Sequence, residues 1–234
     1  MHENTVTKLR HVSTATLTMV LFKLGVRTSW MHGPTPLDSI EERVVGPAFT
    51  VRFVPGREDL MTPESYAGSP AFRDAIEAAP AGSVVVIDAH GHQLGATLGD
   101  ILIARLKHRG VVAAIADSPV RDVDEIRKVG LTVLSNGVAA PPSIAGLAFA
   151  GYGDLIACGG VAVHANDLIV CDNDGAVVVP AALADQVADA GLEQERFERF
   201  VQQKVNAGAS VMGLYPPEED ALAEYQQWLE AGGE

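Results

Sequence analysis

Three short apolar segments in the middle of the chain constrain its fold most. Ser83–Asp88, Val111–Ala116 and Leu131–Leu134 lack the alternation of a strand that turns one face to water. The sequences between them are typical of helices, from about Leu98 to Arg109 and from Arg121 to Val129. Strands that are apolar on both faces and alternate with helices predict a parallel sheet that is covered on both sides.

The flanking sequence predicts further elements around this unit. Helices are expected at Ser13–Leu24, within Glu64–Ala79, from Pro180 to about Asn206, and at Pro217–Glu230, where an amphipathic helix packs on a neighbour. Strands are expected at Val44–Phe53 (with Gly46-Pro47 as an edge or bulge) and Ala176–Val179, while Gly160–Val163 and Leu168–Cys171 pair and Asp172–Gly175 is a turn. No linker or repeat interrupts residues 1–234, so we expect one α/β domain with an N-terminal helix and a C-terminal helical arm. Its predicted fold is a compact layered sandwich with a central, largely parallel sheet flanked by helices.

Composition and charge exclude several classes of function. The formal net charge is −13, from 30 acidic and 17 basic residues among 234, and such a chain repels a nucleic-acid backbone. No apolar run approaches the roughly 20 residues that span a bilayer, and the amino terminus does not resemble a secretory signal. Cys158 and Cys171 stand apart without a CxxC spacing, which indicates neither disulfides nor a zinc ribbon. We therefore expect a cytoplasmic protein that binds neither membrane nor nucleic acid.

Two consecutive strand-to-helix loops carry the candidate functional residues. The first runs from Asp88 to Asp100 and is rich in glycine, and the second is Asp117-Ser118-Pro119-Val120-Arg121-Asp122. In an open parallel sheet, ligands bind at the carboxyl ends of the strands, where the amides of the following helices point outward. Both loops leave the same edge of the sheet, so Asp100 and Asp122 are expected to converge on one site.

A purely structural interpretation of these residues is also open. Thr97 and Asp100 match a capping box, and Ser118-Pro119 matches a helix N-cap followed by proline, with Asp122 complementing the helix dipole. Arg121 is harder to explain in this way, because a cation in the first turn of a helix opposes the dipole. Its position favours an anionic partner, such as a carboxylate held by both arms of the guanidinium.

Other reactive residues are weaker candidates. His90 and His92 are metal-ligand types without a matching third ligand, so they are more often loop residues. Cys158 has no neighbouring histidine or helix start that would activate a nucleophile. The glycines between Gly91 and Gly99 do not form the GxGxxG pattern of dinucleotide-binding proteins.

These motifs together resemble a known family. Gly99-Asp100-Ile101-Leu102, Lys107–Val111 and Asp117–Val123 are similar to the 4-hydroxy-4-methyl-2-oxoglutarate aldolase family, which shares its fold with the regulator of ribonuclease activity A. Flanking segments agree, among them Val45–Thr50 and Asp172–Pro180, so that the resemblance covers most of the chain between residues 13 and 216.

The resemblance implies a class II pyruvate aldolase, dependent on Mg²⁺ or Mn²⁺, that cleaves a 4-hydroxy-2-oxoacid to pyruvate and also decarboxylates oxaloacetate. It implies that Asp122 binds the metal, that Asp100 holds a water near it, and that Arg121 binds the pyruvyl end of the substrate. The backbone amides of Gly99, Asp100, Ile101 and Leu102 would assist Arg121. It further implies a homotrimer or homohexamer, in which a glutamate of the long C-terminal helix, Glu195 or Glu198, completes the site of an adjacent subunit.

Two segments depart from the family pattern, and alternatives remain. Asp117-Ser118-Pro119 stands where the family commonly has Asp-Gly, and Ala165-Asn166-Asp167 where it often has Pro-Gly-Asp. The alternative function is a non-catalytic ring that binds and regulates an endoribonuclease, a branch that lacks the metal-binding carboxylate seen here at Asp122. A methyltransferase is disfavoured because no glycine-rich S-adenosylmethionine loop follows the first strand. Selectivity for the acceptor half of the substrate is expected in the loops Trp30–Ile40 and Arg57–Ala71.

Overall fold

The structure, a computed structural model, describes residues 3–59, 62 and 71–233. Its helices are α1 (Glu3–Leu9), α2 (Thr14–Lys23), α4 (Ala71–Ala78), α5 (Asp100–His108), α6 (Val123–Val129), α7 (Ala184–Asn206) and α8 (Glu219–Glu230), with 3-10 turns η1 (Ser143–Ala145) and η2 (Ala181–Leu183). Its strands are β1 (Thr35–Pro36), β2 (Val44–Pro55), β3 (Val84–Asp88), β4 (Ala113–Ala116), β5 (Thr132–Ser135), β6 (Leu147–Tyr152), β7 (Ile156–Cys158), β8 (Val161–Val163), β9 (Leu168–Asp172) and β10 (Gly175–Val179).

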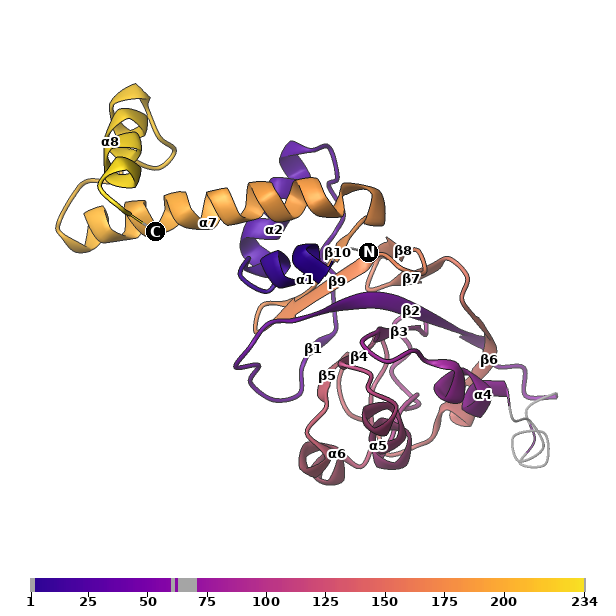
Figure 1. Cartoon of the computed structure of the whole chain (residues 1–234). Coiled ribbons are helices and arrows are strands. Elements are labelled where there is room, and N and C mark those ends of the chain that lie inside the picture. The colour runs from indigo at the N-terminus through magenta and orange to yellow at the C-terminus, as the bar shows by residue number, and fades with distance from the viewer. Residues whose placement is uncertain (1–2, 60–61, 63–70, 234) are drawn as a thin grey trace.

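The main sheet is mixed, with a parallel centre. Its order is β1-β5-β4-β3-β2-β9-β10, and β6 pairs with β2 off this path. The pairs β2–β3, β3–β4 and β4–β5 are parallel, and the continuous apolar strands predicted the last two of these pairs. The strands β1, β6, β9 and β10 join antiparallel, and the sheet curls as it passes from β5 to β10 (Figure 1). The expected α/β class is confirmed.

The long strand β2 connects the two halves of the sheet. Its first part, Val44–Pro47, pairs with β9, and Ala48–Arg52 pairs with β3. The expected edge or bulge at Gly46-Pro47 is therefore wrong, since these residues lie at the junction of the two halves; the irregularity lies instead between Arg52 and Phe53. Glycine is needed at position 46, because a Cβ there would lie 2.5 Å from the carbonyl oxygen of Gly82.

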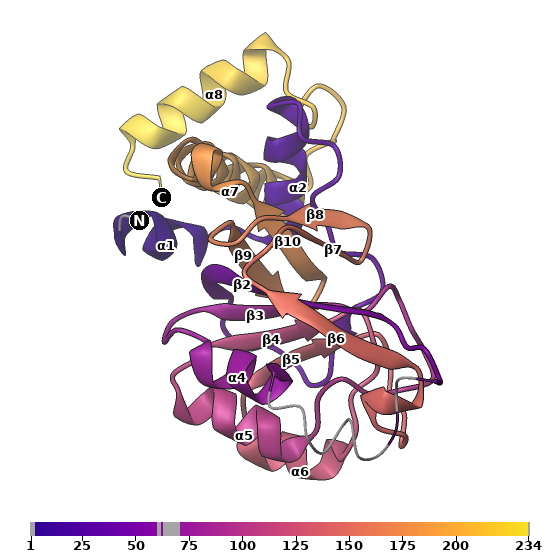
Figure 2. The same ribbon diagram turned by 90° about the vertical axis from the view of Figure 1, so that its right-hand side faces the viewer.

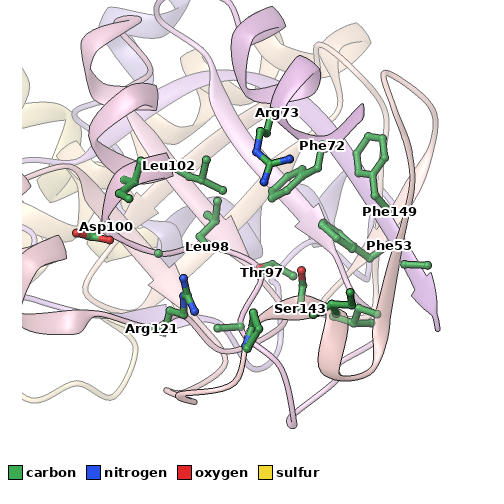
Figure 3. Close-up of a pocket in the computed structure, with 17 residues that line it drawn as sticks. Phe53, Phe72, Arg73, Thr97, Leu98, Asp100, Leu102, Arg121, Ser143 and Phe149 are labelled. Atoms are coloured by element: carbon green, nitrogen blue, oxygen red, sulfur yellow. The ribbon is translucent and has the colours of Figure 1, made fainter. Parts of the chain in front are cut away.

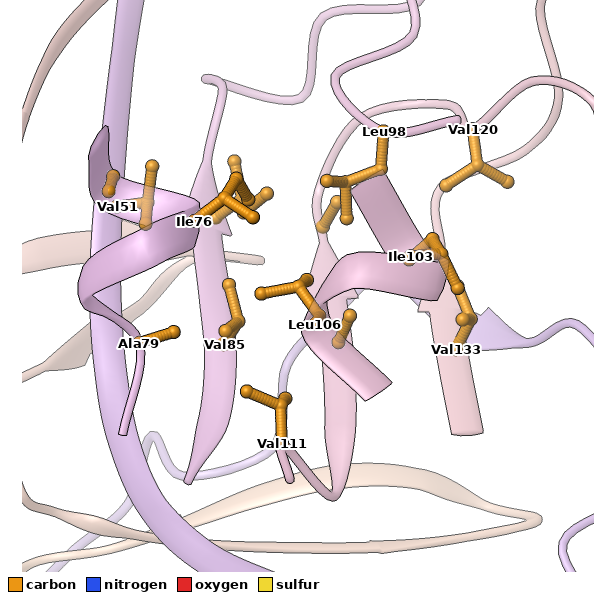
Figure 4. Packing of buried hydrophobic residues seen from close by; sticks show 14 of the residues in the cluster. Val51, Ile76, Ala79, Val85, Leu98, Ile103, Leu106, Val111, Val120 and Val133 are labelled. Atoms are coloured by element: carbon orange, nitrogen blue, oxygen red, sulfur yellow. The ribbon is translucent and has the colours of Figure 1, made fainter. Parts of the chain in front are cut away.

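One face of the parallel strands is covered by helices. α4, α5 and α6 lie side by side on this face (Figure 2). Val85 points toward them and packs in a cluster that includes Ile76, Ile103 and Leu106 (Figure 4), and Ile87 belongs to the same cluster. Burial of these side chains removes apolar surface from water and is the main term that holds the helices to the sheet.

The other face of the parallel strands is covered directly by strands of the curled sheet, and helices flank the sheet as a whole, as predicted. Val84, Val86 and Ile115 pack in a second cluster against residues of β7, β8, β9 and β10. The helices α1, α2 and α7 then cover the outer face of β9 and β10 through a third cluster. From α6 to α7 the layers are therefore helix, curled sheet and helix, with a core inside the curl (Figure 2).

The predicted pairing of the later strands is partly wrong. β8 pairs with β7, which the sequence interpretation missed, and does not pair with β9. The turn at Asp172–Gly175 is confirmed, because β9 and β10 form a hairpin in which Asp172 faces Gly175. The short helix expected within Glu64–Ala79 is present as Ala71–Ala78, and residues 64–70 lie outside the described part.

The C-terminal arm consists of α7 and α8. α7 has 23 residues, and its first half packs on α1 and α2. The predicted tail helix is confirmed as α8, and its neighbour is the second half of α7 in the same chain. Phe197 and Phe200 of α7 contact Tyr225 of α8, with ring centroids 5.2 and 5.5 Å apart. Within the described residues, no helix combines the length and apolar character needed to cross a membrane.

The turn between β8 and β9 explains one departure from the family pattern. Asn166 has a φ of 72°, in the left-handed region that glycine adopts freely and that asparagine tolerates better than most residues. The buried Asp167 beside it accepts hydrogen bonds from the backbone amides of His164 and Ala181, at 2.9 and 3.0 Å. Asparagine therefore serves where the family often has glycine.

We predict that Asn166→Ala lowers the free energy of unfolding by about 1 kcal/mol, because alanine strains the left-handed conformation. Asn166→Gly should leave it unchanged or raise it slightly. Urea unfolding of both variants measures the difference. Equal stability of the alanine and glycine variants would contradict the role given to this backbone conformation.

Candidate active site

Hydrogen bonds between the two predicted loops hold them side by side. Beyond the ends of β3 and β4, Leu98 and Val120 form a parallel bridge. The backbone amide of Arg121 donates to the carbonyl of Leu98 at 3.0 Å, and that of Thr97 donates to Pro119 at 3.2 Å. This extension of the parallel pairing places Gly99-Asp100 beside Arg121-Asp122, as the sequence predicted.

Arg121, Asp122 and Gly99 are in close contact. The Arg121 Nε lies 3.3 Å from the Asp122 Oδ2, and both side chains are about half exposed. A Cβ on Gly99 would lie 3.0 Å from the Asp122 Oδ2 and 3.2 Å from the Arg121 Nε. Glycine at position 99 therefore lets the charged side chains approach the start of α5.

The start of α6 differs from the prediction. Asp122 has a φ of 59° and precedes the helix, which begins at Val123, so Arg121 does not lie in its first turn. The dipole argument for an anionic partner of Arg121 consequently loses its premise. A left-handed aspartate is uncommon, and such backbone strain concentrates at functional positions.

The capping interpretation of these loops is also wrong. The Thr97 hydroxyl lies 2.8 Å from that of Ser118, both residues are buried, and neither caps a helix. The N-cap of α5 is Gly99, and Asp100 is the first helical residue. The backbone amides in the first turn of a helix have no intrahelical partners, so those of Asp100, Ile101 and Leu102 are suited to binding an anion.

A pocket of about 460 Å³ opens beside these amides (Figure 3). Arg121 and Asp100 lie at one end, and three phenylalanines lie at the other (Figure 3). The pocket is lined by Phe53, Phe72, Arg73, Ala96, Thr97, Leu98, Gly99, Asp100, Ile101, Leu102, Arg121, Pro142, Ser143, Ile144, Leu147, Ala148 and Phe149. The aromatic end was not predicted, since β2, α4 and β6 supply its rings from distant parts of the sequence.

The weaker candidates gain no support from their surroundings. His92 packs so closely on the turn after η1 that a Cβ on Gly146 would lie 2.5 Å from its Cε1. The Cys158 thiol is fully buried and donates to the carbonyl of Ile87 at 3.5 Å, and burial raises its pKa, which opposes a role as nucleophile. No group of three or more histidine, cysteine, aspartate and glutamate side chains suited to a metal occurs in the described part of the chain.

Two buried aspartates, Asp88 and Asp117, bind the backbone around the site. The sequence interpretation gave them no role. Asp117 accepts from the amide of Ala89 at 2.6 Å, and Asp88 accepts from the amides of His90 and Ala157, both at 3.1 Å. Both carboxylates stand at the ends of buried strands, and this position is the signal that could have identified them. They bind the following loop and β7 to the ends of β3 and β4.

Glu195 and Glu198 lie on α7, on the side of the molecule opposite α5 and α6 (Figures 1 and 2). Glu195 accepts from the amide of Ser13 at 2.8 Å, at the start of α2. Burial raises its pKa, but the hydrogen bonds from Ser13 and Thr16 outweigh this effect and lower it. Glu198 accepts from Gln194 at 2.9 Å and from the Tyr215 hydroxyl at 3.1 Å. A single chain therefore does not bring either glutamate to Arg121.

The fold matches that of known proteins. The chain belongs to the RraA-like family, described as Aldolase/RraA, whose pattern covers residues 12–178. It is 33% identical to the Streptomyces coelicolor protein RraAS2, described as an unusual member of the RNase ES inhibitor RraA protein family. The match covers 86% of this chain and 97% of that one, with a TM-score of 0.78.

Relatives with an aldolase name are about equally similar. A Halalkalibacterium halodurans protein, provisionally named 4-hydroxy-4-methyl-2-oxoglutarate aldolase, is 29% identical over 86% of this chain and 90% of its own length. A Pseudomonas aeruginosa protein with the same provisional name is also 29% identical, over 65% of this chain and 98% of its own length. The resemblance found in the sequence motifs is thus confirmed at the level of the family.

The raised pKa of Asp117 predicts how the stability of the fold depends on pH. Burial raises this pKa above its ordinary value of 3.8, and the neighbouring Asp88 adds to the effect, although backbone amides oppose it. Between the unfolded and the folded pKa, the folded chain binds more protons than the unfolded chain. The stabilisation from this carboxyl is complete below 3.8 and is lost as the pH rises through the folded pKa.

Asp117→Asn should remove this dependence. The free energy of unfolding of the wild type minus that of the variant should therefore fall as the pH rises through this window. Urea unfolding at a series of pH values measures it. A difference that grows with pH would show that the hydrogen bonds to the ionised carboxylate outweigh its burial.

Proposed function

We propose that this protein is a divalent-metal-dependent carbon–carbon lyase that cleaves a 4-hydroxy-2-oxoacid to pyruvate and decarboxylates oxaloacetate. The observation that carries the proposal is the convergence of Arg121, Asp122 and Asp100 on the first turn of α5, beside one pocket. The provisional aldolase names of relatives at 29% identity support the same class.

The carboxylates present fit Mg²⁺ or Mn²⁺. A hard cation prefers oxygen ligands, and Mg²⁺ usually retains several waters and takes only one or two carboxylates from the protein. Asp122 is half exposed beside Gly99, and Asp100 follows Gly99 directly, so both are accessible to a hydrated ion. A cation held there would supply Lewis-acid stabilisation of the negative charge that develops on the 2-oxo oxygen.

The protein side chains then have separate roles. The Arg121 guanidinium binds the substrate carboxylate, and the free amides of Ile101 and Leu102 orient the same end. When the C3–C4 bond breaks, its electron pair passes to the pyruvyl half as an enolate and the C4 hydroxyl becomes a carbonyl. Asp100 is assigned to hold the water that receives the C4 hydroxyl proton.

Regulation of an endoribonuclease is a second candidate function. It is favoured by the 33% identity to RraAS2 over 86% of this chain. A regulator of this type needs a binding surface but no carboxylate at position 122. Only the lyase function therefore requires Asp122.

We predict that Asp122→Asn lowers metal-dependent pyruvate release by about 100-fold or more, since a Lewis acid contributes several kcal/mol to such a step. Asparagine is the suitable replacement because it tolerates the left-handed φ of 59°, which alanine would strain. Coupled pyruvate assays with and without EDTA measure the loss, with a 4-hydroxy-2-oxoacid and with oxaloacetate.

Asp124→Asn is the matched control. Asp124 follows two residues later on α6, with a side chain 90% exposed, and its substitution should leave turnover unchanged. Full activity of Asp122→Asn at saturating Mg²⁺ would contradict the assignment. If the wild type shows no lyase activity while wild type and Asp122→Asn inhibit an endoribonuclease equally, the regulatory function replaces the proposed one.

A second prediction concerns the shared site that the family resemblance implies. Within its own chain Glu195 accepts from the Ser13 backbone amide at the start of α2, whereas Glu198 accepts from the side chains of Gln194 and Tyr215. Release of Glu198 toward a neighbouring subunit leaves the start of α2 bonded, so we propose Glu198 as the residue that completes the site. Glu198→Gln should lose activity without losing stability, and Glu195→Gln should lose stability.

Co-refolding of Asp122→Asn subunits with Glu198→Gln subunits tests the shared site. Some interfaces of the mixed oligomers will carry both defects and others neither, so part of the activity should return. Mixed oligomers that remain as inactive as their parents would contradict a glutamate shared between subunits. The same mixture with Glu195→Gln shows whether that residue has the role instead.

A further inference from the structure

The aromatic end of the pocket has a defined structure. Phe53, Phe72 and Phe149 contact one another, with ring centroids 4.9 Å apart for Phe53 and Phe72 and 5.7 Å apart for each of the other two pairs. Ile144 and Leu147 add further apolar side chains to the lining of the pocket. Phe53 is buried, whereas Phe72 and Phe149 are half buried and turn toward the pocket (Figure 3). These rings close the core and also form a wall of the pocket.

Polar groups are few at this end. Among the described lining residues, Arg73 and Ser143 are the polar side chains nearest to the rings (Figure 3). Arg73 is exposed at the rim and already has an interaction of its own. The Thr97 hydroxyl, farther along the pocket, is held by Ser118. A second carboxylate placed among the rings would lose its water, while the guanidinium of Arg73 lies at the exposed rim where solvent screens its charge, so this placement is unfavourable.

The size of the pocket gives the same indication. At about 460 Å³ it lies in the range of pockets that bury a drug-sized ligand. Pyruvate bound at Arg121 fills only the polar end. The remaining space continues from Arg121 past Thr97 and Ser143 to the three phenylalanines (Figure 3). A substrate anchored by its 2-oxoacid group therefore directs its C4 substituent toward the rings.

We propose that the preferred substrate carries an apolar group, best an aromatic ring, on C4 of the 4-hydroxy-2-oxoacid. This inference rests on the proposed lyase function and names the other product as an apolar aldehyde or ketone. The ring packs edge to face or offset against Phe72 and Phe149. The Ser143 side chain lies between the two ends of the pocket (Figure 3).

The test compares 4-hydroxy-2-oxo-4-phenylbutanoate with 4-hydroxy-2-oxoglutarate. The two share the pyruvyl half and differ by a phenyl group in place of a carboxylate. We expect kcat/KM for pyruvate release to be at least about tenfold higher for the phenyl substrate. Phe72→Ala should lower this preference by about 10- to 100-fold, because the ring loses a large apolar contact.

Phe49→Ala is the matched control. Phe49 is a half-buried phenylalanine of the same core, its ring packs on Tyr152 with centroids 5.5 Å apart, and it does not line the pocket. It should leave the preference unchanged. An equal effect of Phe49→Ala and Phe72→Ala would overturn the inference, because loss of core packing would then explain both.

A binding measurement separates this inference from the proposed function. Calorimetry with Mg²⁺ compares 4-phenyl-2-oxobutanoate, which lacks the C4 hydroxyl and is not cleaved, with 2-oxoglutarate. We expect the phenyl compound to bind at least about tenfold more tightly, and Phe72→Ala to abolish the difference. If oxaloacetate or the carboxylated substrate is turned over but the phenyl compounds are not preferred, the inference alone fails. If no substrate is turned over, the lyase proposal fails, and the calorimetric preference alone decides whether the pocket selects apolar oxoacids.

Discussion

The parallel pairing of β2, β3, β4 and β5 makes the loops after these strands leave the sheet at one edge, and the rest of the site depends on this alignment. The pairing continues beyond the strands, through the bridges between Leu98 and Val120 and between Val120 and Val138. Because the loops remain hydrogen-bonded outside the sheet, two short polar motifs that are distant in the sequence meet. The buried carboxylates of Asp88 and Asp117 bind the strand ends to the neighbouring backbone.

The sequence predicted the centre of the fold well, because its signals are local. Continuous apolar strands and the Asp172–Gly175 turn each reflect a requirement that neighbouring residues satisfy together. The same reasoning placed Asp100 beside Asp122, since parallel strands align their ends. Predictions that needed distant partners were less successful. β8 pairs with β7 rather than β9, and the Thr97 hydroxyl bonds Ser118 rather than capping a helix.

The details of the site were predictable only in part for a similar reason. The left-handed conformation of Asp122 has no sequence signal, because aspartate also begins helices with ordinary dihedral angles. Gly99 was recognised as part of a motif, but the close approach that requires it appears only when Arg121 and Asp122 are in place. The aromatic end of the pocket gathers one ring each from β2, α4 and β6. Periodicity marks such rings as core residues and does not reveal that one wall of the core faces a ligand.

The C-terminal arm, formed by α7 and α8, affects which part of the molecule unfolds locally. The end of α7 and α8 share a small apolar cluster of their own, formed by Phe197, Phe200, Val201, Leu214, Ala221 and Tyr225. This cluster is distinct from the three that bury the sheet, and α7 joins the two regions, because its first half belongs to the third cluster and its second half to this one. The two regions are therefore separate cooperative units, and α8 can detach by local unfolding while the curled sheet stays closed. Amide hydrogens in α8 will then exchange with solvent faster than those in β3 and β4. This exchange occurs by local unfolding of α8, while the loops around Arg121 stay folded.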